Sequence, residues 1–273
     1  MVSHFKSLFL LFSLILTSVF TAIGQENKLQ GNQKKDDKTS NKQQKPDPKN
    51  PTSEQVAETV VFIYAGAGGR EGLKQIRKTT FENGKVNLTN GDGISETISY
   101  ERRILRGENL EKERIRIDQE FPNAKYALIY NDSKIVGLFN ETVFTPREDA
   151  SRSFQNQIWH GLEALLRYKE NGATVQLAGR EKHMGIEYFV LEVTDKEKRK
   201  TRFFVSTNTF RVMWLEYTQD EIKYMRKFYD YRYAQGTLVP YRTVLFANGK
   251  QVEESTVSTA TFGQKLEEDI FKP

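Results

Sequence analysis

The amino-acid sequence predicts an α+β domain in which an antiparallel sheet of about ten strands curves around two main helices. From residue 77 onward, segments rich in Val, Ile, Phe, Tyr and Thr alternate with turn residues at roughly ten-residue intervals, which is typical of an antiparallel meander. Two longer segments, one before the meander and one within it, carry apolar residues at helical spacing. Each of these helices needs a sheet face to lie on.

The chain begins with a segment typical of export. Residues 5–23 place an apolar stretch of about 13 residues after Lys6, and the small residues Ala22 and Gly24 precede a plausible cleavage point. We therefore expect residues 1–24 to be a signal peptide and the protein to work in the periplasm. An uncleaved signal anchor in the inner membrane is the alternative, because residues 7–24 are just long enough to span a bilayer.

Residues 25–54 form a second, polar segment. Leu29 is its only large apolar residue, among three prolines and many Lys, Asp, Asn and Gln residues. Such a stretch buries too little apolar surface to offset the entropy lost on ordering, so we predict a disordered linker. The linker is either a tether that lets the domain reach from a surface or a tail without a role.

Charge and cysteine content exclude several classes of function. Residues 25–54 hold seven lysines against five acids, which leaves 33 basic and 31 acidic residues in 55–273. A nearly neutral domain is not typical of nucleic-acid binding, so no nucleic-acid partner is expected. The chain has no cysteine, which excludes disulfides, thiolate nucleophiles and Cys-ligated metals.

The first predicted helix follows Thr52. Thr52 and Gln55 have the spacing of a capping box, and apolar residues then recur at helical spacing through Tyr64. Gly66 should end the helix. The glycine patch 66–69 lacks the Lys-Ser/Thr of a phosphate loop, so we interpret it as a tight turn that leads through 72–76 into the first strand.

Turn residues divide the meander that follows. Asn83-Gly84 is consistent with either a hairpin turn or a bulge inside one strand. The other turns are expected at 90–93, 107–109, 131–133, 184–185, 195–200, 206–209, 219–220, 235–236 and 248–249.

A second helix of about 24 residues should interrupt the meander. Thr145 suits the N-cap, Pro146 the first helical position and Glu148 the third, and the helix should end at Asn171-Gly172. Its apolar residues form one stripe, which must lie against the sheet. The stripe consists of Phe154, Ile158, Leu162, Leu165 and Leu166.

The sequence shows no convergent catalytic or metal-binding cluster. Outside the leader, the histidines are His160, which should point away from the apolar stripe, and His183, which should lie in an exposed turn. We therefore expect no metal, no cofactor and no enzymatic activity. A two-carboxylate hydrolase stays open, because the pairing of distant carboxylates cannot be seen in one sequence. The basic run 196–200 is interpreted as a solvated turn, with weak docking on an anionic membrane as the alternative.

Aromatic residues are concentrated late in the chain. Residues 203–246 contain twelve, and strand alternation there and in 189–193 predicts one broad apolar sheet face. Ordinary sheet packing would account for it, but two helices are few to cover such a face, so we expect a cavity between helices and sheet. A 16-carbon acyl chain gains about 12 kcal/mol when its methylenes are buried, which an enclosed cavity can match and a surface patch cannot.

Four segments together resemble the LolA-like outer-membrane lipoprotein-sorting proteins. They are 65–76, Trp159-His160-Gly161-Leu162, 231–242 with Asn248-Gly249-Lys250, and the tail 266–273, and the resemblance covers nearly all of 55–273. It implies a periplasmic half-barrel whose concave face, covered by helices, takes up the acyl chains of a lipid or lipoprotein.

These observations predict a non-enzymatic carrier with the domain at 55–273. It would act as a monomer and exchange lipid or lipoprotein cargo with membrane-bound donor or acceptor proteins. The alternative is a periplasmic sensor or scaffold that uses the same fold to bind a protein partner. The residues expected to line the cavity are Trp159, Leu162, Leu166, Phe189, Leu191, Phe203, Val205, Met213, Leu215 and Tyr217.

Overall fold

The computed structural model of the protein describes residues 50–89, 93, 95–121, 124–140 and 142–273. The expected signal peptide and nearly all of the expected linker lie outside these residues. The chain divides into Met1–Pro51 and a compact unit, Thr52–Pro273, which holds all the elements discussed below. No helix in the described part combines the length and the apolar character needed to cross a membrane.

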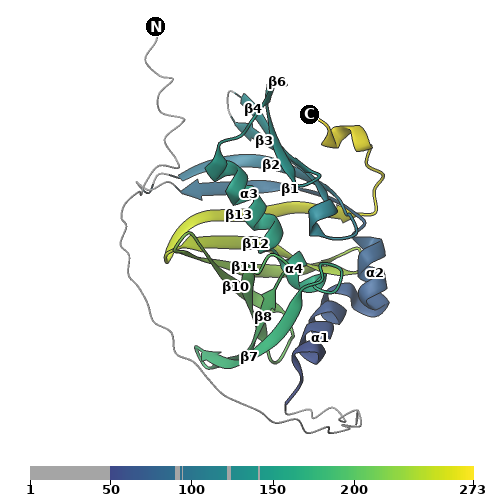
Figure 1. Ribbon diagram of the computed structural model, residues 1–273, viewed down its shortest axis with the longest axis vertical. Helices are drawn as coiled ribbons and strands as arrows, with labels where there is room; N and C mark the ends of the chain where they lie inside the picture. The colour runs from purple at the N-terminus through teal and green to yellow at the C-terminus, as the bar shows by residue number, and fades with distance from the viewer. Residues whose placement is uncertain (1–49, 90–92, 94, 122–123, 141) are drawn as a thin grey trace, which may run out of the picture. The chain divides into compact units, whose positions relative to one another are not determined.

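The described strands form one antiparallel sheet that stays open, with β6 and β7 at its two edges (Figure 1). The α+β class is confirmed, and the strand count is 13 in the described residues rather than about ten. The strands run as β1 Thr79–Thr89, β2 Ser95–Leu105, β3 Arg114–Phe121, β4 Ala124–Asn131, β5 Lys134–Phe139, β6 Thr142–Phe144, β7 Thr174–His183, β8 Ile186–Thr194, β9 Lys200–Ser206, β10 Val212–Gln219, β11 Ile222–Ala234, β12 Thr237–Ala247 and β13 Lys250–Phe262.

The strand order explains how the sheet is built. Each strand pairs with its neighbour in sequence within β1–β6 and within β7–β13, and β1 joins the two halves by pairing with β13. Asn83-Gly84 lies inside β1 and is not a hairpin turn; the register shift there is a bulge in the partner strand, because Asn83 faces Thr259 and Gly84 faces Val257, which leaves Ser258 of β13 unpaired with β1. Glycine is needed there because a Cβ on Gly84 would lie 2.2 Å from the carbonyl oxygen of Thr256. The other predicted turns fall between strands, except that 90–92 lie outside the described residues.

Helix α1 (Ser53–Ala65) has the predicted ends. Gln55 N donates to Thr52 Oγ1 (3.2 Å) and Thr52 N donates to Gln55 Oε1 (2.8 Å), which completes the capping box. Gly66, at φ 63°, ends the helix. The expected turn and strand lead-in at 66–76 were wrong, because a 3-10 turn η1 (Gly66–Gly68) is followed by helix α2 (Gly69–Ile76). The guanidinium of Arg70 fixes this helix by pairing with Glu58 and Glu170.

The second predicted helix is broken in two. Helix α3 (Glu148–Trp159) begins after Arg147, not after Thr145, and His160 ends it. Gly161 is extended (φ −80°, ψ 176°) before helix α4 (Leu162–Leu166). A Cβ on Gly161 would lie 2.6 Å from the carbonyl oxygen of Gln157, so this close approach of the chain needs glycine. The break changes the direction of α4 relative to α3, so that both short helices pack apolar side chains into the main core. Two further 3-10 turns are η2 (Leu110–Lys112) and η3 (Glu268–Phe271).

The main hydrophobic core lies between one face of the sheet and the helices α1, α3 and α4 (Figure 1). Strands β8, β9 and β10 contribute alternate residues to this core, and the residues between them form a second cluster on the opposite face. That second cluster consists of Tyr188, Val190, Phe204 and Trp214, with Met213 and Met225 packed against it.

Candidate functional site

The residues predicted to line a cavity come together, with one exception, between α3, α4 and strands β8–β10. Leu166, Phe189, Leu191, Phe203, Val205, Leu215 and Tyr217 are buried members of the main core, and Trp159 and Leu162 pack against it half-buried. We name this region the interior.

Met213 is the exception. The register of β10 against β9 shifts between Val212 and Trp214, so the simple alternation expected for Met213, Leu215 and Tyr217 is interrupted. Met213 packs instead with the cluster on the opposite face of the sheet. No periodic pattern in the sequence marks this bulge.

Side chains of the protein itself fill the interior. Leu191, Phe203, Val205 and Leu215 are each 0% exposed. From the helix side, Phe154, Ile158, Leu165 and Leu166 pack into the same core. An acyl chain can therefore enter the region between these residues only if the helices above it move.

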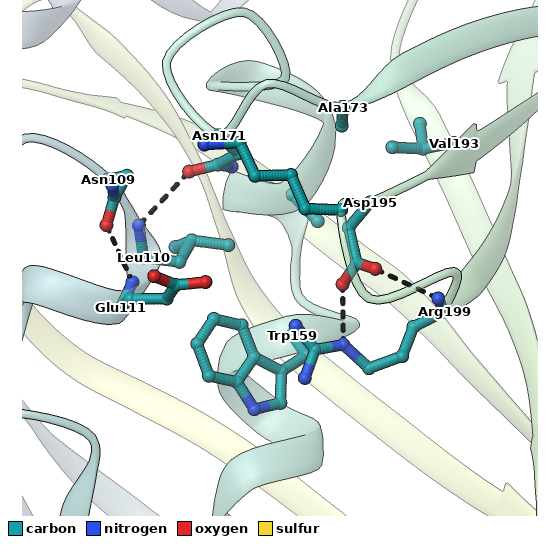
Figure 2. A pocket seen from close by; sticks show the side chains of 11 residues that line it. Asn109, Leu110, Glu111, Trp159, Asn171, Ala173, Val193, Asp195 and Arg199 are labelled. Atoms are coloured by element: carbon teal, nitrogen blue, oxygen red, sulfur yellow. Dashed lines mark hydrogen bonds and ion pairs between the residues drawn. The ribbon is translucent and has the colours of Figure 1, made fainter.

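A small hollow opens at one end of the interior, and we name it the Trp159 pocket (Figure 2). Its volume is about 30 Å³, which is room for one or two water molecules and far below the roughly 300–1,000 Å³ of ligand pockets. It lies where the end of α3, α4, the η2 turn and the β8–β9 turn meet. Its lining is Asn109, Leu110, Glu111, Trp159, Ala164, Asn171, Ala173, Val193, Asp195, Lys196 and Arg199.

Arg199 forms one wall of the Trp159 pocket. Its guanidinium carbon lies 4.2 Å from the centre of the Trp159 ring, a cation–π contact. Arg199 Nε is 2.5 Å from Asp195 Oδ2, and the Arg199 backbone N–H donates to Asp195 Oδ1 at 2.9 Å. Figure 2 shows how these contacts fix the arginine over the indole. The pair leaves little net charge on this wall.

Asn171 forms the opposite wall. Its Oδ1 accepts a hydrogen bond from the backbone N–H of Leu110 at 3.1 Å, which ties the end of the α4 segment to the η2 turn (Figure 2). Its Nδ2 is buried and donates to no partner among the described residues. An unsatisfied buried donor costs free energy, so it marks a place where an acceptor would be stabilised.

His160 was wrongly expected to be exposed. It is 5% exposed, its Nδ1 lies 2.7 Å from Thr201 Oγ1, and its ring stacks on Tyr217 at 4.0 Å between centroids. Burial, helped by the charge of Arg199, lowers the pKa of His160 to about 4, so the ring is neutral at pH 7. The expectation assumed one continuous helix, whereas the break at Gly161 turns this residue inward. His183 is exposed, as expected, beside Glu181.

Helix α4 is held by a buried ion network that the sequence did not indicate. Glu163 Oε1 lies 2.7 Å from Arg77 Nη1 and 3.0 Å from Arg106 Nη2, and Glu113 pairs with both Arg106 and Arg167. Burial alone would raise the pKa of Glu163, but the guanidinium groups of Arg106 and Arg77 outweigh it and lower that pKa to about 2. Only the fold brings these distant residues together.

Helix α3 is held less firmly. Only Phe154 and Ile158 of its residues are buried. Its charged contact with the sheet is the exposed ion pair of Arg152 with Asp220 in the β10–β11 turn. Exposed pairs contribute about 0–1 kcal/mol. The apolar contacts therefore account for most of the docking free energy of α3.

An open, antiparallel sheet that carries its helices and its main core on one face defines a LolA-like fold. A LolA superfamily protein from Nitrosomonas europaea shares it with TM-score 0.58 and 14% identity, covering 82% of this chain and 99% of its own.

Two further solved structures have the same fold. A DUF1329 family protein from Desulfovibrio piger gives TM-score 0.58 at 14% identity, covering 81% of this chain and 97% of its own. A candidate outer-membrane lipoprotein-sorting protein domain from Vibrio parahaemolyticus gives TM-score 0.55 at 16% identity, covering 79% and 97%. No protein-family model and no curated protein sequence matches the chain.

Proposed function

We propose that the protein is an exported, non-enzymatic carrier that shelters the acyl chains of a lipid or lipoprotein in its interior. One observation supports this most strongly. The aliphatic and aromatic face of β8–β10 is shared between α1, which contacts β7 and β8, and α3, a helix that fully buries only Phe154 and Ile158. The LolA-like fold of lipoprotein-sorting proteins agrees with this assignment.

Helix α3 would act as the lid. Burying a large apolar side chain stabilises by about 1.5–3 kcal/mol, so Phe154 and Ile158 together contribute roughly 3–6 kcal/mol to the docking of α3. Trp159, half-buried at the end of α3 against Tyr130 and Arg199, adds to this and is the part of the helix nearest to α4. A 16-carbon chain gains about 12 kcal/mol on burial from water. Uptake of an acyl chain can therefore offset the release of α3. Release of α4 would also break its buried ion network, so α4 stays in place.

Cross-linking the lid tests this mechanism. The chain has no cysteine, so the double variant Arg152→Cys/Asp220→Cys can be joined by a bifunctional, reducible thiol reagent without side reactions at other thiols. The two positions already meet as an ion pair between α3 and the β10–β11 turn. We expect the cross-linked protein to lose uptake of a fluorescent fatty acid and to regain it when the linker is reduced.

A control separates lid locking from chemical damage. Glu192→Cys/Lys200→Cys replaces an ion pair of 2.8 Å between β8 and β9, and the same reagent there should leave uptake unchanged. Native mass spectrometry of protein secreted from an exporting host should also show bound lipid. Bare protein together with no fatty-acid uptake before cross-linking would overturn the proposal.

The filled interior favours a second candidate, a periplasmic sensor or scaffold that binds a protein partner. Leu162→Asp distinguishes the two, because Leu162 packs half-buried against the core. A carrier should stay folded and lose fatty-acid uptake, whereas a scaffold with a permanently solid core should unfold at lower urea concentration and never take up lipid.

A further inference from the structure

The Trp159 pocket combines an apolar floor with unmatched polar donors. Its walls include Leu110, Ala164 and Val193, which are buried members of the same core as the interior. A ligand seated in this pocket would therefore touch the interior with one end. The other end would meet the polar groups at the rim, so the pocket suits an amphiphile.

Two donors at the rim have no partner among the described residues. Asn171 Nδ2 is buried and unpaired, while Asn171 Oδ1 is already used by Leu110. Lys196 forms no hydrogen bond or ion pair with any residue that the structure describes. Its stem lies against Gly172, because a Cβ on that glycine would be 2.4 Å from Lys196 Cε and 3.3 Å from Nζ. The ammonium group therefore lies near the turn that contains Asn171 and Gly172.

Of the remaining charges of the pocket, Arg199 and Asp195 are paired with each other, and Glu111 lies at the exposed edge. Arg199 is paired with Asp195 and stacked on Trp159, so neither its charge nor that of Asp195 is available to a ligand. Glu111 is exposed at the edge, and its carboxylate has no side-chain partner among the described residues. The buried unmatched group is the donor Asn171 Nδ2, and Lys196 adds a second donor, so a ligand oxygen that accepts hydrogen bonds fits at the Asn171 side of the pocket.

We propose that the Trp159 pocket binds the acceptor oxygen at the head of an acyl group, with Asn171 Nδ2 and Lys196 Nζ as donors, while the acyl chain extends into the interior. The inference rests on the proposed carrier function and names the part of the cargo that is recognised. The oxygen can belong to a carboxylate or to an ester carbonyl, and the experiment separates these sources.

The test compares three ligands that share one chain length. Palmitate, methyl palmitate and hexadecane, delivered from cyclodextrin, compete with a fluorescent fatty acid for the protein secreted from an exporting host. Because a hydrogen bond to a charged donor is lost with hexadecane, we expect the two head-bearing ligands to bind about tenfold more tightly. Preference for palmitate alone would assign the carboxylate, and equal preference for the ester would assign the carbonyl.

Two variants identify the donors. Asn171→Asp keeps the acceptor for Leu110 N and removes the donor, and Lys196→Met keeps the stem over Gly172 and removes the charge. Each should weaken palmitate binding about three- to tenfold and leave hexadecane binding unchanged. Lys198→Met is the matched control, because Lys198 lies in the same turn, is exposed and does not line the pocket.

The outcomes separate the two proposals. Equal affinity for all three ligands, or unchanged palmitate affinity in both variants, would overturn the head-group inference and leave the carrier function standing. Binding of none of them by the unmodified protein would overturn both. Thermal unfolding shows whether each variant folds. If Asn171→Asp does not fold, the binding data of Lys196→Met test the proposal, because Lys196 is exposed and its substitution should not affect folding.

Discussion

Truncation of Ile158 should lower the free energy of unfolding of the protein and raise its affinity for acyl chains. Ile158 is 5% exposed and is one of the two buried residues of α3. Replacing a buried isoleucine with alanine costs about 2–5 kcal/mol. If α3 is a lid, the side chain stabilises only the closed state. Ile158→Ala therefore lowers the free energy of unfolding and the free energy needed to open the lid by the same amount.

The substitution should therefore lower stability in one assay and raise ligand affinity in another. Urea unfolding of the unliganded variant should show a loss of at least about 2 kcal/mol. Since a ligand that binds the open state no longer has to offset this amount, the apparent Kd for a fluorescent fatty acid should fall by about thirtyfold. Few single substitutions in a core destabilise a protein and raise its affinity together.

Val190→Ala supplies the control. Val190 is 1% exposed and lies in the cluster on the opposite face of the sheet, so its loss affects the closed and open states equally. It should lower stability and leave the affinity for the fatty acid unchanged. If Ile158→Ala lowers stability while its affinity stays level or falls, α3 is not the lid, and the reasoning from its shallow burial is refuted.

Three further predictions concern stability. Glu163→Gln should cost about 3–5 kcal/mol in urea unfolding at pH 7, because it leaves Arg77 and Arg106 without their shared carboxylate. The pKa of Glu163 in the folded protein is about 2, so its contribution to the free energy of unfolding is complete above pH 4.5 and is lost as the pH falls toward 2. Glu163→Gln should therefore lose less stability than the unmodified protein over this pH range. An equal loss in both proteins would contradict the ion network. His160→Gln should flatten the decline in stability between pH 6.5 and 4, since the folded pKa of His160 is lowered to about 4 and the unfolded chain takes up the proton first. Gly84→Ala should destabilise the protein by about 1–3 kcal/mol, because the new Cβ would meet Thr256 O. Gly68→Ala should leave stability unchanged, because a Cβ there has no atom within 4 Å. Thermal unfolding of the two variants makes the comparison.

Local signals in the sequence predicted the elements whose ends depend on neighbouring residues. The capping box of Thr52, the stop at Gly66 and the hairpin turns between strands were found because turn and cap chemistry acts over a few residues. The break at Gly161 was missed because a glycine in an apolar stripe is compatible with a continuous helix until the sheet beneath it is known.

Only part of the candidate site could be predicted from the sequence. Strand alternation correctly grouped Phe189, Leu191 and Phe203, but the bulge in β10 moved Met213 to the other face. The donors of the Trp159 pocket could not be grouped, because Asn171 and Leu110 are 61 residues apart and only tertiary packing joins them. The same is true of Arg77 and Glu163, which are 86 residues apart.

The open edges of the sheet have a consequence for self-association. Within the part of the chain that the structure describes, β6 and β7 have no strand on their outer sides, so a strand of another molecule can add there. β6 has only three residues, and β7 contains a register shift at Gly179 followed by Arg180, Glu181 and Lys182. Short length, a bulge and alternating charge all discourage edge-to-edge growth. The fold thus leaves its sheet unclosed without inviting fibres, and crowded molecules in solution should stay separate.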